Sequence, residues 1–127
     1  MTSGAATDFH SHLVPGVDDG AADIVESRLA VAAMVRDGVT TAIVTPHFDG
    51  SLTLAPPMMQ ERLAQLDAGF AQLTADAEVA GCGLRLLRGV ELMLDVPDPD
   101  VNDERLRRGG GRVVLVEFPG QQLPRSH

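Results

Sequence analysis

Two histidines separated by a single residue, His10 and His12, lie at the end of a short apolar segment near the start of the chain. Side chains alternate between the two faces of an extended strand, so both rings point the same way and can converge on one ion. Neutral imidazole is the commonest metal ligand in proteins, and the preceding Asp8 is placed to orient one of the rings. Histidine pairs also occur as structural features, so a metal site requires further ligands elsewhere in the chain.

The elements around this pair are predicted to alternate between strands and helices. Asp23 and Glu26 have the spacing of a capping box and Gly38 is a typical helix stop, which predicts a helix over residues 23–37. A second helix is predicted over residues 57–80, because apolar residues recur at helical spacing: Leu63, Leu66, Phe70, Leu73 and Ala77. Strands are predicted over residues 6–10, Thr40–Thr45, Leu84–Leu92 and Arg112–Phe118, with a short helix around Asp103–Arg108. This order predicts the α/β class with parallel strands.

Residues with metal-binding side chains fall at the carboxyl ends of all four predicted strands, where the chemistry of βα barrels gathers. They are His10 and His12 after the first strand, His47 after the second, Glu91 at the end of the third and Glu117 at the end of the fourth. Asp18 and Asp19 lie in the loop after the first strand, on the same side. The strand ends therefore predict one shared site.

Each of these residues also has an ordinary structural interpretation. His47 could cap a turn, and Glu91 could pair with Arg88 or Arg112. Four successive strands that carry such a residue at the same end favour the shared metal site. Mixed histidine and carboxylate ligands suit Mn, Fe or Zn better than Ca or Mg.

Composition excludes several classes of function. The chain has 127 residues and a net charge of −8, and its ten basic residues are all arginine, which excludes a lysine Schiff base. An acidic protein is also a poor partner for nucleic acid, whose phosphate backbone needs a basic surface. The single cysteine, Cys82, excludes an internal disulfide, and no apolar run approaches the roughly 20 residues of a membrane span. The sequence predicts a cytoplasmic protein that is one domain or part of one, with an aliphatic core.

Two other motifs indicate different chemistry but fit less well. Cys82 and Arg88 have the Cys-x5-Arg spacing of cysteine-dependent tyrosine phosphatases, which hold phosphate in a loop of backbone N–H groups. The residues between them instead predict the entry to a buried strand. The acidic run 95–103 is similar to a calcium loop, but Asp103 stands where such a loop needs glycine and no glutamate follows at the twelfth position. We expect an exposed acidic loop.

Five motifs together resemble the PHP (polymerase and histidinol phosphatase) superfamily. They are, in chain order, Asp8-x-His10-x-His12, Gly16-Val17-Asp18-Asp19-Gly20, Thr45-Pro46-His47, Gly89-Val90-Glu91-Leu92 and Val116-Glu117-Phe118. The string from His12 to Ala21, read as His-Leu-Val-Pro-Gly-Val-Asp-Asp-Gly-Ala, is similar to the bacterial tyrosine phosphatases of capsule and exopolysaccharide operons. The resemblance covers nearly everything from Asp8 to Pro119.

The resemblance implies a distorted barrel of seven βα units around up to three divalent ions, manganese first, with iron or zinc as alternatives. Asp18, like Asp8, would orient its neighbours rather than bind metal. By motif, the ligands of the first ion would be His10, His12 and Glu91. The second ion would be bound by Glu91 and Glu117, and the third by Asp19 and His47.

The activity that the resemblance implies is metal-assisted phosphoester hydrolysis, most specifically by a protein-tyrosine phosphatase that regulates capsule or exopolysaccharide biosynthesis. Its substrate and partner would be a phosphotyrosine protein, the tyrosine kinase of the same pathway. One alternative is another PHP phosphoesterase, acting on histidinol phosphate or a sugar phosphate. A second alternative is a non-catalytic, metal-binding remnant of such an enzyme.

Members of this family are much longer, and their second half supplies further histidine and aspartate ligands and the arginines that hold phosphate. The motifs therefore predict a partial domain over residues 1–119 and a tail over residues 120–127 that matches none of the family's motifs. We do not expect the terminal His127 to replace one of the missing ligands. Four strands cannot close the barrel, so we expect a truncated product or one completed by another chain. We expect this chain to be weakly active or inactive, marginally stable, and prone to self-association through its open sheet.

Overall fold

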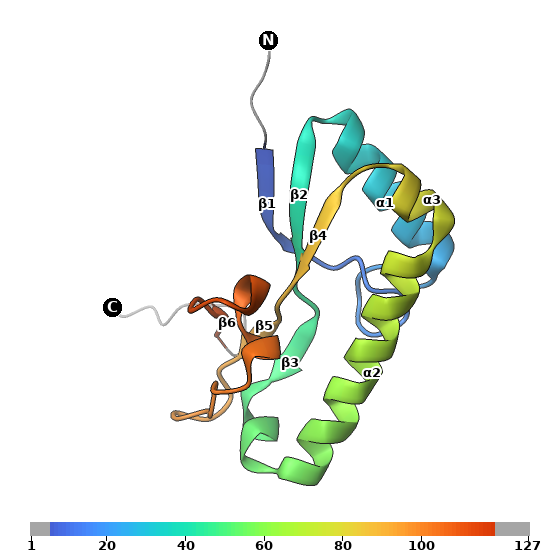
Figure 1. Cartoon of the computed structure of the whole chain (residues 1–127). Helices are drawn as coiled ribbons and strands as arrows, with labels where there is room; N and C mark the ends of the chain where they lie inside the picture. Colours follow the sequence, from blue (N-terminus) through green and yellow to red (C-terminus); the bar gives the residue numbers. More distant parts are fainter. Residues whose placement is uncertain (1–5, 119–127) are drawn as a thin grey trace.

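The structure, a computed structural model, describes residues 6–118. The predicted tail and His127 lie outside the described residues. The α-helices are α1 (Ile24–Arg36), α2 (Pro56–Ala75) and α3 (Ala77–Gly81), and three 3-10 turns are η1 (Gly50–Leu54), η2 (Glu104–Leu106) and η3 (Arg108–Gly110). The strands are β1 (Ala6–Ser11), β2 (Val39–Val44), β3 (His47–Asp49), β4 (Arg85–Arg88), β5 (Glu91–Met93) and β6 (Leu115–Glu117). The three α-helices lie on one side of the strands (Figure 1).

All the strand pairs in the described residues are parallel. One sheet has the order β1-β2-β4 and the other the order β3-β5-β6. The chain runs from β2 into β3 through residues 45–46, and from β4 into β5 through residues 89–90. The predicted α/β class with parallel strands is confirmed. Within residues 6–118 both sheets are open, and the seven-unit barrel stays a prediction.

The prediction of one continuous strand over Leu84–Leu92 was wrong. Pro46 has no N–H to donate, so it interrupts the ladder of the neighbouring strand. Gly89 lies so close to η3 that a Cβ atom would be 3.2 Å from Cα of Arg108. These two interruptions divide each long strand in two. As a result, His47 and Glu91 are the first residues of β3 and β5, directly beyond the carboxyl ends of β2 and β4.

The prediction of a single helix over residues 57–80 was also wrong. Asp76 has an extended backbone between α2 and α3, and its side chain accepts a hydrogen bond from the N–H of Val79 at 3.1 Å. Aspartate competes for backbone N–H groups in this way and favours a new helix start over a helix interior. Ala77, predicted on the buried face, is therefore exposed, and Val79 is buried in its place.

The predicted start and end of α1 are confirmed. Oδ1 of Asp23 accepts from the N–H of Glu26 at 3.0 Å, and Oε1 of Glu26 accepts from the N–H of Ala22 at 2.9 Å. Gly38 follows the helix with φ of +91°, a conformation that glycine adopts without strain. These caps fix the direction in which the chain leaves the loop after β1.

Two apolar clusters support the two sheets. The first packs α1, α3 and the C-terminal part of α2 against the β1-β2-β4 sheet and includes Val31, Val44 and Leu73. The second packs α2 against β3 and β5 and includes Phe48, Leu66 and Leu92. Among residues 6–118, no helix combines the length and the apolar character that crossing a membrane requires.

Candidate metal centre

The first group of converging side chains joins the end of β1 to the start of β5. Nε2 of His10 and Nε2 of His12 lie 3.0 Å apart. Oε1 of Glu91 lies 2.7 Å from the His10 nitrogen and 2.9 Å from the His12 nitrogen. Glu91 is 8% exposed, whereas the His10 side chain is 48% exposed. Two ring nitrogens and a buried carboxylate oxygen thus face a common point that is open to solvent on the His10 side.

The second group joins the loop after β1 to the start of β3. Nε2 of His47 lies 3.1 Å from Oδ1 of Asp19. Nδ1 of His12 lies 3.0 Å from Oδ2 of Asp18, which also accepts a hydrogen bond from the N–H of His47 at 3.1 Å. The rings of His12 and His47 are stacked with centroids 4.6 Å apart. Asp18 therefore connects the two histidines through the ring of one and the backbone of the other.

The third group lies across β3, β5 and β6. His47 is directly opposite Glu91 in the parallel register of β3 and β5. Nδ1 of His47 lies 3.7 Å from Oε1 of Glu91 and 3.4 Å from Oε1 of Glu117, at the end of β6. The strand pairing therefore brings His47 together with Glu117, which is distant from it in the sequence.

The structure brings all six predicted ligands together. Within each group, one ligand atom from every residue lies within 4.8 Å of the others. Each group contains one of the sets expected from the motifs. In addition, His47 lies with the second set, and His12 and Asp18 lie with the third. The three groups are His10, His12 and Glu91; His47, Glu91 and Glu117; and His12, Asp18, Asp19 and His47.

The two aspartates predicted as orienting residues differ in what they contact. Oδ1 of Asp8 accepts a hydrogen bond from the backbone N–H of His10 at 2.9 Å, so this aspartate binds the backbone of His10 rather than its ring. Asp18 contacts the His12 ring and accepts a further hydrogen bond from the N–H of Gly20 at 2.9 Å. Of the two, Asp18 has the geometry that fixes the orientation of an imidazole.

Two residues that the sequence interpretation did not single out fix the start of the loop that carries several of the predicted ligands. Ser11 is buried, and its hydroxyl donates to the carbonyl of Ile43 at 2.9 Å. The N–H of Thr45 donates to the carbonyl of Ser11 at 2.7 Å, and the fully buried Thr45 hydroxyl lies 3.2 Å from the N–H of Ser11. These bonds connect the ends of β1 and β2, and so hold His10 and His12 beside the segment that leads to His47.

A glycine allows the same loop to fold tightly over His12. A Cβ atom on Gly20 would collide with the backbone oxygen and Cβ of His12. The N–H of Ala21 donates to the carbonyl of His12 at 3.1 Å, and the N–H of Gly16 donates to the carbonyl of Ala21 at 2.9 Å. The segment from Val17 to Asp19 is thereby folded back toward the histidines.

The charges of Asp18 and His12 stabilise each other. The hydrogen bond to Asp18 raises the pKa of His12 above 6.5, and this outweighs the opposing effect of burial. Burial disfavours the charged form of Asp18, but hydrogen bonds from His12, Gly20 and His47 lower its pKa from 3.8 to about 2. Burial likewise acts against the charge of Glu91, and the hydrogen bond with His10 and the nearby histidines lower the pKa of Glu91 below 4.5.

A pH titration of the metal-free chain tests this pair. Asp18→Asn is expected to lower the pKa of His12, because it removes the carboxylate that favours the imidazolium. The His12 charge stabilises the fold below pH 6.5, and this contribution is lost as the pH rises through the raised pKa. The Asp18 charge stabilises it above pH 3.8, and this contribution is lost as the pH falls toward about 2. NMR titration of the His12 ring measures the shift, and an unchanged His12 pKa in the variant contradicts the pairing.

The donor set suits a divalent transition metal. Nitrogen ligands lie about 2.0–2.1 Å from such ions, so adjacent ligand atoms are separated by roughly 3 Å. The three ligand atoms of the first group are 2.7 to 3.0 Å apart. Imidazole and carboxylate together favour Mn, Fe or Zn over Mg or Ca. The residues present therefore fit a metal ion in both chemistry and spacing.

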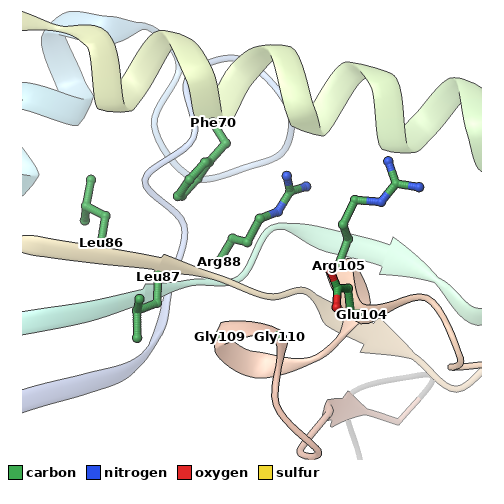
Figure 2. Close-up of a pocket in the computed structure, with 8 residues that line it drawn as sticks. All are labelled: Phe70, Leu86, Leu87, Arg88, Glu104, Arg105, Gly109 and Gly110. Carbon is green, nitrogen blue, oxygen red and sulfur yellow. The ribbon is translucent and has the colours of Figure 1, made fainter.

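An apolar cavity lies away from these predicted ligands. It measures about 310 Å³ and lies between α2 and the strand β4, with Phe70, Leu86 and Arg88 among its lining residues (Figure 2). NH1 of Arg88 lies 2.7 Å from Oδ1 of Asp67, and its guanidinium lies over the Phe70 ring. None of the predicted ligands lines this cavity.

The alternative motifs have structural roles. Cys82 caps the end of α3, and residues 85–88 form β4 rather than a loop that cradles phosphate. In the acidic run, the carboxylate of Asp95 accepts from the N–H of Ser51 at 2.8 Å and from its hydroxyl at 2.7 Å. Asp103 caps η2 through the N–H of Arg105 at 2.9 Å. These contacts explain the positions of those residues without catalysis or calcium.

Known proteins are similar in sequence to nearly the whole length of this chain. Residues 6–125 match the CpsB/CapC family of capsular polysaccharide synthesis. Tyrosine-protein phosphatase YwqE of Bacillus subtilis is 30% identical over 121 residues, which make up 93% of this chain and 45% of that protein. Tyrosine-protein phosphatase CpsB of Streptococcus pneumoniae is 30% identical over 113 residues, 87% of this chain and 44% of that protein.

The structural comparison gives the same relatives. The match is a chain from the crystal structures of YwqE and CpsB, described as unique metal-dependent tyrosine phosphatases, with 27% identity and a TM-score of 0.59. It covers 94% of this chain and 47% of the other, so this chain spans about half the length of the relatives it matches. The resemblance predicted from the motifs is confirmed: the chain belongs to the CpsB/CapC family of capsular polysaccharide synthesis.

Proposed function

We propose that this chain carries one half of the active site of a metal-dependent phosphoester hydrolase, a protein-tyrosine phosphatase of capsule or exopolysaccharide synthesis. The observation that carries the proposal is the overlap of three ligand groups. His12, His47 and Glu91 each belong to two of the groups, so ions held by these groups would share ligands. Adjacent ions that share ligands are typical of enzymes that hydrolyse phosphate esters.

The proposed cofactor is a divalent transition metal, with manganese first and iron or zinc as alternatives. When bound, such ions activate water at neutral pH and neutralise the charge on phosphoryl oxygens. The proposed ligands are His10, His12, Asp19, His47, Glu91 and Glu117.

The side chains of this chain supply position and charge. Glu91 presents one carboxylate oxygen to the rings of His10 and His12 from a buried position on β5. Asp18 holds the His12 ring by its other nitrogen, which leaves Nε2 directed at Glu91. Asp19 is exposed, with 84% of its side chain accessible, so a phosphoester can approach the cluster from that side.

The proposed substrate is a phosphotyrosine protein, and the proposed partner is the tyrosine kinase of the same pathway. Support comes from the names of the relatives, two of which are tyrosine-protein phosphatases. A cytoplasmic location also remains a proposal. A phosphatase for histidinol phosphate or a sugar phosphate is the alternative among enzymes, and turnover of those compounds beside a phosphotyrosine peptide separates the two.

A metal-binding remnant without activity is the second alternative. The chain spans less than half of YwqE and of CpsB. Bound metal without turnover of any of these phosphoesters would support the remnant, whereas metal-dependent turnover supports the enzyme. The weak activity expected from the sequence makes a sensitive assay with high protein concentration necessary.

The chemistry of the phosphatase is tested by one substitution and one chelator. Cys82→Ser is expected to leave the hydrolysis of a phosphotyrosine peptide unchanged, because Cys82 lies at the end of α3 and outside all three ligand groups. EDTA is expected to abolish hydrolysis, and added Mn²⁺ to restore it. Loss of activity in a folded Cys82→Ser protein, together with resistance to EDTA, would contradict the metal mechanism.

A further inference from the structure

One arginine on α2 contacts both of the segments that carry the second ligand group. NH2 of Arg62 donates to the backbone carbonyl of His47 at 2.7 Å. NH1 of the same side chain donates to the carbonyl of Val17 at 3.2 Å and to the amide oxygen of Gln65 at 2.8 Å. Val17 immediately precedes Asp18 in the loop after β1. One guanidinium group therefore joins two segments that are well separated in the sequence.

The face of α2 that carries Arg62 is packed against the same loop. Gly69 is seven residues further along α2, which is about two helical turns, so the two residues lie on one face. A Cβ atom at Gly69 would collide with Cγ1 of Val14, a residue that is itself 1% exposed. Leu66 lies between them and is buried in the second apolar cluster. The position of Arg62 is thus fixed by close packing of the helix against the loop.

The hydrogen bonds of Arg62 complement a direct bond between the same two segments. The N–H of His47 donates to Oδ2 of Asp18, and that same oxygen lies against Nδ1 of His12. The backbone N–H of His47 is therefore bound through Asp18, and the backbone carbonyl of His47 is bound through Arg62. A shift of either segment would lengthen both bonds and separate Asp19 from the His47 ring.

We propose that Arg62 is a positioning residue, which holds the Asp18–Asp19 loop and the His47 segment together before a metal ion binds. The inference rests on the proposed function, because it assigns Arg62 to the assembly of that site. Within residues 6–118, Arg62 donates hydrogen bonds to Gln65 and to two backbone carbonyls, so its effect on the site passes through the backbone.

Arginine is suited to this position for a geometric reason. Its planar guanidinium presents several N–H donors in a fixed fork, so NH1 and NH2 can serve two separate carbonyls at once. A lysine ammonium has the same charge but is a single point on a flexible chain. Arg62→Lys should therefore keep the charge and lose the bridge, while Arg62→Met removes both and retains the apolar stem.

Hydrogen exchange of the metal-free chain tests the proposal directly. The reporters are the backbone N–H groups of His47 and Gly20, both of which donate to the Asp18 carboxylate. Exchange at these two amides is expected to be about tenfold faster or more in Arg62→Met, and intermediate in Arg62→Lys, because hydrogen bonds to a charged group are lost. Amides within β2, such as that of Val44, should exchange as in the parent chain.

Arg28→Met is the matched control. Arg28 donates to Asp76 from NH2 at 2.8 Å and joins α1 to the start of α3, away from the ligand loops. This variant also removes an arginine that bridges two segments, but it should leave the amides of Gly20 and His47 unchanged. If Arg62→Met does not fold, Arg62→Lys against Arg28→Met gives the same comparison.

Titration with Mn²⁺ or Zn²⁺ provides the second measurement. We expect at least about tenfold weaker binding in Arg62→Met and no change in Arg28→Met, in line with the cost of losing residues that orient ligands. Exchange at Gly20 and His47 that is equal in the parent and Arg62→Met, or that rises equally throughout the fold, overturns the positioning role. If the parent chain binds neither metal, the proposed function fails, and the exchange comparison still decides the role of Arg62.

Discussion

Glu91→Gln is expected to weaken the binding of Mn²⁺ at least about 100-fold, since even residues that only orient metal ligands contribute 10–100-fold to affinity. Oε1 of Glu91 lies within 3.7 Å of ring nitrogens from three histidines and belongs to two of the three ligand groups. The amide keeps the size of the side chain but loses its negative charge, and an amide oxygen is a weaker ligand than a carboxylate. Isothermal titration calorimetry, with MnCl₂ added to the purified chain, measures the loss of Mn²⁺ affinity.

Glu61→Gln is the matched control for this prediction. Glu61 is exposed on α2 and belongs to none of the three ligand groups, so the same change in charge should leave metal affinity unaltered. Circular dichroism should show that both variants keep the parent content of helix and strand. Equal affinity of Glu91→Gln and the parent would remove Glu91 from the centre, and equal losses in both variants would indicate a non-specific effect of net charge.

The sequence predicts which side chains converge because the relevant signals are local. A histidine pair after a strand, or a glutamate after an apolar run, is visible without any knowledge of the fold. Since parallel strands bring their carboxyl ends to one edge, the residues His10, His47 and Glu91 could be expected to meet. The structure places these side chains within one cluster.

The interruptions of the elements were harder to predict, because they depend on contacts between distant segments. The run from Leu84 to Leu92 is apolar enough for a single strand. It divides because Gly89 lies against Arg108 and because Pro46 opens the ladder of the neighbouring strand. Asp76 ends α2 partly through Arg28 of another helix, whose NH2 lies 2.8 Å from its carboxylate.

The groups that support the ligands are the part of the site with the weakest sequence signal. Arg62 is one charged residue on a largely polar helix surface, and nothing in its neighbours indicates that it reaches the carbonyl of His47. Ser11 and Thr45 similarly become visible only when β1 and β2 are paired. Such residues act through backbone groups of other segments, so their roles follow from tertiary structure alone.

The apolar residue between His47 and Asp49 links the stability of the fold to the integrity of the ligand cluster. Phe48 is 1% exposed and packs in the second cluster with Leu63, Leu66 and Leu92. Phe48→Ala is expected to lower the free energy of unfolding by about 3–5 kcal/mol, because a large cavity remains where the ring was. A single domain is stabilised by only about 5–15 kcal/mol, so this loss would unfold a substantial fraction of a marginally stable chain.

Urea denaturation followed by circular dichroism measures this effect, with Phe118→Ala as the control. Phe118 is 55% exposed beyond the end of β6, and its removal should change the free energy of unfolding by no more than about 0.5 kcal/mol. Because Phe48 is flanked by His47 on β3, the variant should also lose metal affinity as the strand loosens, whereas Phe118→Ala should keep both. Equal midpoints for the two variants would contradict the placement of Phe48 in the core that supports the ligands.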